Sequence, residues 1–395
     1  MKSERVPCNL CGQERFTPVL TDSKTDFSQG FCSNCGLIYV NPRLDGPSRA
    51  RFYATYGQKY PESFLMNREN PYLQIARKRA IFFKDFVRSL PDRPKTLMEV
   101  GCSYGFFLKE LGEQNVGVAT HGIDPSFTEV EFARRANGLS NVRTGLVGDL
   151  RGSRQRFDVI ALFHVLEHLG DPVETLRIIH GVLKENGLIW VEVPDAGELK
   201  GDIIEFQHLV SCQHLYEFSQ VTLRGMLEQA GFEEVVLEKA PLGFFLSSNQ
   251  RAVFRKRKGG RVATPMRKDT QAQGYLSVFR DRIMKIREDV QTWFDEQERH
   301  GRPIYIYGGG FHTMGLLGLI ELHNGSVRAI LDDDSTKHGS SIEGLQVMDP
   351  TLLEEQHEVA IIVSTLVGEE RILARLGDFR GPDWEIKTIY KDATT

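Results

Sequence analysis

Four cysteines near the N-terminus stand at the spacing of a metal site. They form two C-x-x-C pairs, Cys8 with Cys11 and Cys32 with Cys35, and a glycine follows each pair. Two such turns bring four thiolates to the ~2.3 Å at which sulfur binds Zn²⁺, and four cysteine ligands leave no open position for a substrate. The segment between the pairs is too short to bury a core of its own. We therefore expect a structural zinc ion; the alternative is a pair of reduced turns.

A second candidate site is the stretch from Thr96 to Leu108, TLMEVGCSYGFFL. An apolar run stops here at a glycine-containing loop and continues as a helix pattern. Glycines let the backbone approach a ligand closely, and the first amides of the next helix attract an anionic group. The residues of interest are Glu99 at the end of the strand, then Gly101, Ser103 and Gly105 in the loop. Their spacing does not match the dinucleotide fingerprint G-x-G-x-x-G, and an ordinary turn is the alternative.

The elements that must position this loop alternate between strand and helix patterns up to about residue 258. Such alternation predicts an α/β fold with a parallel sheet and helices on both faces. Ligands of these sheets bind at the carboxyl ends of the strands. We expect Asp124 to end the second strand, where a ribose diol needs a carboxylate, and Asp149 to end the third, near an adenine amino group. Either residue taken alone also suits an ordinary strand end.

Residues 94–258 resemble the class I S-adenosylmethionine (SAM)-dependent methyltransferases, whose first motif reads E/D-x-G-x-G-x-G. The resemblance is carried by E-x-G-x-x-x-G from Glu99, DVIALFHVLEHLGDP (158–172), RIIHGVLKENGLIWVEVP (177–194) and HLYEFSQVTLRGMLEQAGF (214–232). Together with the cysteine unit and a C-terminal glycine loop, the whole chain resembles the three-domain sugar C-methyltransferases, which act on nucleotide-linked 4-keto deoxysugars. The resemblance implies SAM contacts from Glu99, Gly101, Ser103 in place of the middle glycine, Gly105, Asp124, Asp149, Phe163 and His164.

The same resemblance points to a group of candidate catalytic residues. The family shows Tyr-Asp-Glu-His where this chain has Ser-Cys-Gln213-His214, within the expected substrate lid at 201–219. Carbon methylation next to a ketone needs a base for the α proton, and a histidine with a pKa of about 6.5 suits that task. We predict His214 as the base, with Gln213 and His168 orienting the substrate oxygen and Tyr216 in the same site.

Several alternatives to this mechanism stay open. O-methylation of a hydroxyl needs only a proton acceptor and alignment of the two reacting atoms. His214 could instead cap or pack the following helix, and the missing family glutamate and tyrosine also suit a protein that binds SAM or a nucleotide sugar without turnover. The letters from His164 to His168, H-x-x-E-H, match the inverted zinc-protease signature. That signature needs a helix, whereas the preceding FDVIALF reads as a buried strand running into it.

The C-terminal part repeats the strand and glycine-loop pattern. RPIYIYGGGFHTMG resembles the C-terminal Rossmann-like domain of the same family, with Gly308 to Gly310 placed to hold a phosphate and Asp332 to hold a ribose. A purely structural, oligomerising role is the alternative. The basic, aperiodic segment 255–274 reads as a linker. We thus predict a zinc-binding domain with a helical extension (1–70), a methyltransferase domain (71–258) and a Rossmann-like domain (270–395).

Composition limits the classes of partner. The 395 residues are 41% apolar and 26% charged, as in soluble globular proteins, and the net charge of −4 argues against a nucleic-acid partner such as RNA. The N-terminus lacks the apolar core of a signal peptide, and no apolar run approaches the ~20 residues that span a bilayer. We expect a cytoplasmic monomer or homodimer acting on a small molecule, with no nucleic-acid or membrane partner.

Overall fold

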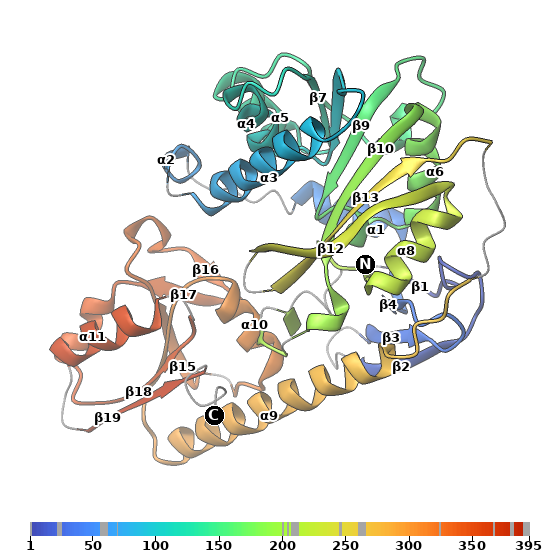
Figure 1. Ribbon diagram of the computed structural model, residues 1–395. Coiled ribbons are helices and arrows are strands. Elements are labelled where there is room, and N and C mark those ends of the chain that lie inside the picture. The colour runs from blue at the N-terminus through green and yellow to red at the C-terminus, as the bar shows by residue number, and fades with distance from the viewer. Residues whose placement is uncertain are drawn as a thin grey trace. The chain divides into compact units, whose positions relative to one another are not determined.

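The computed structural model describes residues 2–21, 26–55, 62–68, 70–199, 201–203, 205–206, 213–244, 247–259, 266–323, 325–365, 368–379 and 383–389. The chain divides into two compact units (Figure 1). The N-terminal unit comprises Met1–Leu199 with Leu209–Leu276, and the C-terminal unit comprises Lys200–His208 with Ser277–Thr395. Each unit is described by itself below.

The segment that contains the four N-terminal cysteines, residues 2–44, forms a small antiparallel sheet and is called the cysteine segment. Its strands are β2 (Phe16–Thr21), β3 (Ser28–Cys32) and β4 (Ile38–Val40), and a short pair joins β1 (Ser3–Glu4) to β5 (Arg43–Leu44). The fourth strand of the sheet comes from far along the chain, because β11 (Tyr216–Glu217) pairs with β4. The short helices α1 (Gly46–Thr55) and α2 (Glu62–Leu65) follow. The cysteine segment therefore holds the backbone beside His214.

The main sheet of this unit has seven strands in the order β12-β13-β10-β9-β6-β7-β8. Its parallel strands are β6 (Thr96–Val100), β7 (Ala119–Asp124), β8 (Val142–Thr144), β9 (Phe157–Phe163) and β10 (Leu183–Pro194). The hairpin β12 (Phe232–Phe244) and β13 (Ser247–Lys256) extends it in the antiparallel sense. The chain first builds outward from β6 through β7 to β8 and then continues on its other side with β9. The topological switch point thus lies between β6 and β9.

Helices cover both faces of this sheet, as the strand and helix alternation predicts. Along β9, Val159, Ala161 and Phe163 pack with α3 (Pro71–Arg88), α4 (Phe106–Glu113) and α5 (Phe127–Arg135). The intervening Ile160 and Leu162 pack with α6 (Pro172–Val182) and α8 (Gln220–Gln229) on the other face. This period of two is that of a strand buried on both sides.

The helix starts follow local capping chemistry. Pro71 and Pro172 occupy the first turns of α3 and α6, where a missing N–H costs nothing. Ser126 caps α5, and Ser219 caps α8 by accepting a hydrogen bond from the amide of Thr222. Because Ser219 fills the cap of α8, the alternative that His214 caps this helix is wrong.

The C-terminal unit has a second, mostly parallel sheet in the order β16-β17-β15-β14-β18-β19. Its strands are β14 (Ile304–Tyr307), β15 (Val327–Leu331), β16 (Ser341–Ile342), β17 (Leu345–Met348), β18 (Glu358–Val363) and β19 (Asp383–Thr388). The long helix α9 (Ala272–Arg299) comes before β14 in the chain. Helix α10 (Phe311–Leu319) follows β14, and α11 (Glu369–Phe379) follows β18. Short 3-10 turns η4 (Ser335–Lys337) and η5 (Pro350–Glu355) connect the strands. The expected α/β fold class is confirmed in both units.

The structure tests the predicted linker but not the predicted domain bounds. The predicted linker at 255–274 is wrong at both ends, because β13 continues to Lys256 and α9 begins at Ala272. The amide of Asp269 donates to the carbonyl of Cys35, so the backbone at Asp269 lies beside the cysteine segment. The predicted bounds of the three domains stay predictions. Within the described ranges, none of the helices combines the length and apolar character needed to cross a bilayer.

Candidate functional site

The four N-terminal cysteines converge as the spacing predicts. The Sγ atoms of Cys8 and Cys35 are 3.5 Å apart, as are those of Cys11 and Cys32, and all four lie within 4.8 Å of one another. A tetrahedral zinc with ~2.3 Å bonds has sulfur–sulfur edges of ~3.8 Å, so the cluster fits this ion. In each pair, the following glycine donates its amide to the carbonyl of the first cysteine at a positive φ.

At the carboxyl end of β6, Glu99 is a buried carboxyl group. It is 5% exposed, and its Oε2 has no hydrogen-bond partner among the described residues. Burial raises the pKa of Glu99 well above its ordinary value; the charge of Arg79 lowers it, and that of Asp124 adds to the rise. An orphaned acidic group at this edge of the sheet fits a cationic ligand group, which would stabilise its charged form.

The loop after β6 has the conformation that only small residues adopt easily. Gly101 and Gly105 have φ values of 74° and 73°, and Ser103 has 46°. A Cβ atom at Gly101 would lie 2.4 Å from Cγ2 of Val165. The glycine is therefore required both by its backbone conformation and by the close approach of the loop after β9.

Asp124 ends β7, as predicted, and already organises the loop. Its Oδ2 accepts a hydrogen bond of 2.8 Å from the amide of Ser103, and its Oδ1 accepts one from the amide of Ser126. Burial raises the pKa of Asp124, while these two hydrogen bonds lower it. Burial also raises the pKa of the neighbouring Glu129 to about 7. Three carboxyl groups therefore gather around this loop.

The position of Asp149 differs from the expectation. The third strand, β8, ends at Thr144, and Asp149 lies in the 3-10 turn η1 (Val147–Leu150) beyond it. Its side chain is exposed, and its Oδ2 accepts a hydrogen bond of 2.8 Å from the amide of Leu146. The strand is short because the polar, glycine-containing segment after it turns at Gly145. A role for Asp149 toward adenine stays a prediction.

Phe163 and His164 lie where β9 ends. Arg79 stacks on the Phe163 ring, with its guanidinium carbon 4.3 Å from the ring centroid. His164 has a φ of 54°, which is uncommon for a residue with a side chain, and its Nε2 lies 3.0 Å from Nδ2 of Asn249 on β13. Strain of this kind is typical of functional sites.

His214 and His168 are brought together at the same edge, with ring centroids 4.8 Å apart. His214 is 8% exposed, and its Nδ1 lies 2.8 Å from Oε1 of Glu217. Burial alone would lower the pKa of His214, but the charge and hydrogen bond of Glu217, together with the charge of Glu167, outweigh it, so the pKa is raised. The carboxylate requires a hydrogen on Nδ1, which leaves the lone pair of the neutral ring on Nε2.

His168 has the opposite electrostatics. Burial, followed by the charge of His214, lowers the pKa of His168 to about 4. Its Nδ1 lies 2.8 Å from the backbone carbonyl of Gln213, which can only accept a hydrogen bond. His168 is therefore neutral near pH 7, and its Nε2 carries a lone pair. It is suited to accept a hydrogen bond rather than to donate one.

Tyr216 is held by the cysteine segment. Its hydroxyl accepts a hydrogen bond of 2.8 Å from Arg43 and donates to the carbonyl of Gly170. The side chain is 1% exposed. These contacts indicate a structural role for Tyr216. Among the other predicted lid residues, His208, Ser211 and Cys212 lie outside the described residues.

The H-x-x-E-H motif does not form a protease-like helix. β9 ends at Phe163, and the motif continues into a single 3-10 turn, η2 (Leu166–His168). Glu167, His168 and His214 nonetheless place one ligand-type atom each within 4.8 Å of one another. Burial would raise the pKa of Glu167, but His164 and the other two histidines outweigh it and lower it. The Glu167 side chain is therefore ionised.

Sequence reasoning missed three polar residues of the site, Glu129, Glu217 and Asn249, and considered Glu167 only as part of the H-x-x-E-H motif. Glu217 was detectable as a charged residue in the apolar HLYEFS segment, three positions after His214. Asn249 carried no signal, because its approach to His164 depends on the hairpin pairing.

Two family models match this chain. Residues 72–238 match a methyltransferase domain, and residues 255–386 match a C-methyltransferase C-terminal domain. The central part of the chain is a methyltransferase domain. The expectation of a methyltransferase domain is thereby confirmed, whereas the activity of the whole protein, the zinc ion and the sugar substrate stay predictions.

Relatives of this methyltransferase domain have several activities. A tRNA U34 carboxymethyltransferase from Desulfotalea psychrophila is 29% identical over 111 residues, which are 27% of this chain and 34% of the relative. A ubiquinone biosynthesis O-methyltransferase from Methylobacterium nodulans is 27% identical over 166 residues, 38% of this chain and 64% of the relative. The match thus spans less than two thirds of either relative.

A solved SAM-dependent methyltransferase from Archaeoglobus fulgidus is similar at 19% identity, with a TM-score of 0.38, over 47% of this chain and 94% of that one. The plantazolicin methyltransferase BpumL, solved with S-adenosylhomocysteine (SAH) and a monoazolic desmethylPZN analogue, gives 13% identity and a TM-score of 0.41 over 53% of this chain and 94% of that one. Likeness at this level carries no argument about substrate.

Proposed function

We propose that this protein is a SAM-dependent methyltransferase that methylates the carbon next to the 4-keto group of a nucleotide-linked deoxysugar. The observation that carries the proposal is the buried pair of His214 and Glu217 at the ligand edge of the methyltransferase sheet. The match of residues 255–386 to a C-methyltransferase C-terminal domain supports carbon as the acceptor. The nucleotide sugar rests on the whole-chain resemblance.

The acidic residues around the β6 loop support SAM as the methyl donor. SAM carries a positive sulfonium and a positive ammonium group, and when bound it supplies an electrophilic methyl group. Glu99, whose Oε2 is an orphaned buried oxygen, and Asp124 at the end of β7 are placed to hold such a ligand. Gly101, Ser103 and Gly105 let the backbone approach it closely.

His214 is suited to the proton transfer. Nε2 of the neutral ring takes the α proton of the ketone, and Glu217 stabilises the imidazolium that results. The electron pair of the broken C–H bond would move into the enolate, whose carbon would take the methyl group as the sulfur–methyl bond of SAM breaks and SAH leaves. The side chain of Gln213 is proposed to donate a hydrogen bond to the enolate oxygen. His168, whose Nε2 is an acceptor when Nδ1 donates to the carbonyl of Gln213, orients a substrate hydroxyl instead.

A second candidate is O-methylation of a hydroxyl group. The relatives named as ubiquinone biosynthesis O-methyltransferases favour it. The same lone pair on Nε2 of His214 would then accept the hydroxyl proton.

A structural zinc ion is proposed for Cys8, Cys11, Cys32 and Cys35. Their sulfur atoms lie at nearly the separations of a zinc tetrahedron, and three of the four side chains are at most 1% exposed. The ion would join the two C-x-x-C pairs. The sheet formed by this segment also includes β11, which pairs with β4. The ion would take no part in methyl transfer, because four thiolates leave no open position.

The direct test is incubation of the protein with SAM and a panel of dTDP- and GDP-linked 4-keto and 4-hydroxy sugars. Mass spectrometry would report a methyl gain, and ¹³C-labelled SAM with NMR would report the atom that carries it. A new C–CH₃ bond beside the ketone is the expected result. A methyl ether would establish O-methylation, and SAM binding without turnover on any acceptor would favour a silent binding protein.

Replacing Glu217 with glutamine is expected to shift the pH dependence of the reaction. In the native protein the pKa of His214 is raised, so activity should fall as pH drops through a value above 6.5. Without the carboxylate, burial lowers this pKa, so the acidic limb should move to lower pH while kcat falls about tenfold. The matched control is Glu233→Gln, which alters an exposed glutamate on β12. An unchanged pH profile would contradict the pairing.

A further inference from the structure

Three side chains at the ligand edge of the methyltransferase sheet have the chemistry of a metal site. Glu167, His168 and His214 each place one ring nitrogen or carboxylate oxygen within 4.8 Å of the other two. Glu167 and His168 belong to the turn η2, and His214 lies just before β11. In a tetrahedral site with bonds of ~2.1 Å the ligand atoms are ~3.4 Å apart, so small side-chain rotations bring these atoms to that separation.

Glu167 carries a negative charge that the protein leaves without hydrogen bonds. Its side chain is 0% exposed, and neither carboxylate oxygen has a hydrogen-bond partner among the described residues. Nδ1 of His164 approaches Oε1 to 3.2 Å, but this contact lacks hydrogen-bond geometry. A buried carboxylate without such partners is costly, and a bound cation removes that cost.

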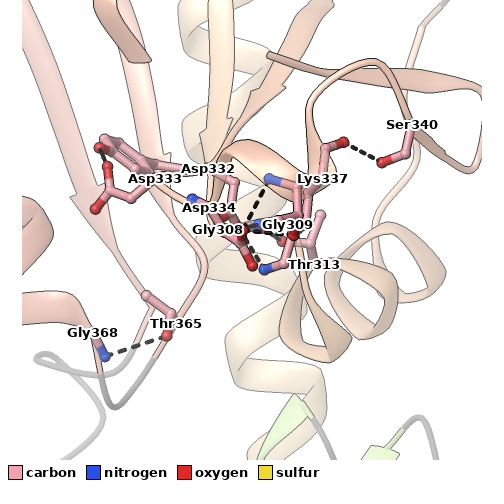
Figure 2. A network of polar contacts seen from close by, with 12 residues as sticks. Gly308, Gly309, Thr313, Asp332, Asp333, Asp334, Lys337, Ser340, Thr365 and Gly368 are labelled. Carbon is pink, nitrogen blue, oxygen red and sulfur yellow. Dashed lines mark hydrogen bonds and ion pairs between the residues drawn. The ribbon is translucent and has the colours of Figure 1, made fainter. Parts of the chain in front are cut away.

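A carboxylate that is already satisfied has different surroundings. In the C-terminal unit, Oδ2 of Asp332 accepts a hydrogen bond of 2.7 Å from the amide of Gly309 and lies 2.8 Å from the Lys337 ammonium (Figure 2). Its Oδ1 accepts a hydrogen bond from the amide of Asp334. Both oxygens of Asp332 therefore have donors, whereas Glu167 has the unmet charge that a bound cation would balance.

Both histidines have the outer contacts that are usual for metal ligands. Nδ1 of His214 lies 2.8 Å from Oε1 of Glu217, and Nδ1 of His168 lies 2.8 Å from the carbonyl oxygen of Gln213. Each of these oxygens accepts a hydrogen from Nδ1, which puts the lone pair of the neutral ring on Nε2. Metal-bound histidines usually donate their other ring N–H to a carboxylate or a backbone carbonyl in this way.

The H-x-x-E-H motif contributes to this set only in part. Glu167 and His168 belong to it, but Nε2 of the first histidine, His164, lies 3.0 Å from Nδ2 of Asn249. The third ligand is His214, from a later part of the chain. The set therefore differs from that of an inverted zinc protease, which takes both histidines from one helix.

The ligand types select the class of ion. Imidazole nitrogens favour Zn²⁺, Co²⁺ and other divalent transition metals, whereas Mg²⁺ and Ca²⁺ prefer oxygen ligands. Three protein ligands leave a coordination position for water, unlike the four cysteines of the N-terminal cluster. Because the set contains no thiolate, we expect it to bind its ion more weakly and more reversibly than that cluster.

We propose that Glu167, His168 and His214 bind a divalent transition-metal ion that inhibits methyl transfer. Nε2 of His214 has one lone pair, which cannot bind a metal ion and accept a proton at the same time. The metal-loaded protein therefore lacks the base assigned above. The inhibition rests on the proposed function, whereas the binding of the metal ion does not.

The test of binding is titration of the full-length protein with Co²⁺, whose visible absorption reports its ligands. One cobalt ion per chain should bind with the bands of nitrogen and oxygen ligation, and Zn²⁺ but not Mg²⁺ should displace it. Glu167→Gln and His168→Asn should each weaken cobalt binding about tenfold or more, since loss of an outer contact alone has an effect of this size. The matched control is Glu233→Gln, at an exposed glutamate on β12, which should keep the native affinity. Melting temperatures report whether each variant is folded.

The test of inhibition uses the exchange of the α proton of a 4-keto nucleotide sugar in D₂O, followed by methylation with SAM. Zn²⁺ should suppress both reactions over the concentration range in which it displaces cobalt. In Glu167→Gln that range should move upward by about tenfold or more, in parallel with the weaker cobalt binding. The Glu233→Gln control should be inhibited like the native protein.

Absence of a cobalt site, or equal cobalt affinity in Glu167→Gln, His168→Asn and the native protein, would overturn the proposal. A spectrum dominated by sulfur-to-cobalt charge transfer would do the same, because it would place the ion at the cysteine cluster. Undiminished turnover with the site loaded would overturn the inhibition. Cobalt bound through Glu167 and His168 in a protein that methylates no acceptor would support the metal site, and only the proposed function would then have failed.

Discussion

His214→Asn is expected to lower methyl transfer by about 10²- to 10⁴-fold, the usual contribution of a general base. SAM affinity should stay within about threefold, because the residues proposed to hold SAM lie on other loops. Asparagine is chosen because its amide can still donate to Glu217 and so preserve the buried hydrogen bond. Single-turnover kinetics and titration with SAM would measure the two effects separately.

The control for this substitution is His323→Asn, at a histidine whose side chain is 76% exposed in the C-terminal unit. It should leave turnover unchanged. Turnover close to that of the native protein in His214→Asn would contradict the assigned base. Joint loss of SAM binding and of the folded state would show that the histidine is structural.

Removal of the zinc ion is expected to abolish activity together with the fold of the N-terminal sheet. Zinc binding by four thiolates contributes roughly 10 kcal/mol or more to the folding of such a unit. The effect should reach the active site, because β4 follows the second C-x-x-C pair and is hydrogen-bonded to β11, which carries Glu217. Metal analysis should find one zinc per chain, and Cys32→Ser should lower the zinc content, the melting temperature and kcat.

Cys102→Ala is the matched control, since Cys102 is buried but lies outside the metal cluster. This variant should keep its zinc ion, with a small loss of stability from the missing sulfur. A zinc content near zero in the native protein would contradict the metal assignment. A zinc-free variant with full activity would contradict the proposed coupling through β11.

Local sequence patterns predicted the framework of both sheets. Apolar runs ending at Gly101 and Gly308 marked the first strand of each sheet, because a glycine loop before a helix is a short-range signal. The convergence of the cysteines followed from their spacing alone. Asp124 was found because a strand must end where its apolar pattern ends.

Long-range pairing explains most of what the sequence did not predict. The contact of Tyr216 with Arg43 joins residues 173 positions apart, and nothing near either residue indicates it. Glu217 raises the pKa of His214 because the backbone conformation at β11 brings the two side chains into contact. Asp149 was misplaced because strand β8 is only three residues long, which is too short for a period-of-two pattern.

The most direct test of the central claim is exchange of the substrate α proton in D₂O without SAM. A 4-keto nucleotide sugar incubated with the protein should gain one deuterium next to the ketone, as mass spectrometry would show, and should then be methylated at that carbon when SAM is added. The His214→Asn variant should not catalyse the exchange. Methylation of a hydroxyl group without deuterium uptake would contradict carbon-acid chemistry by His214.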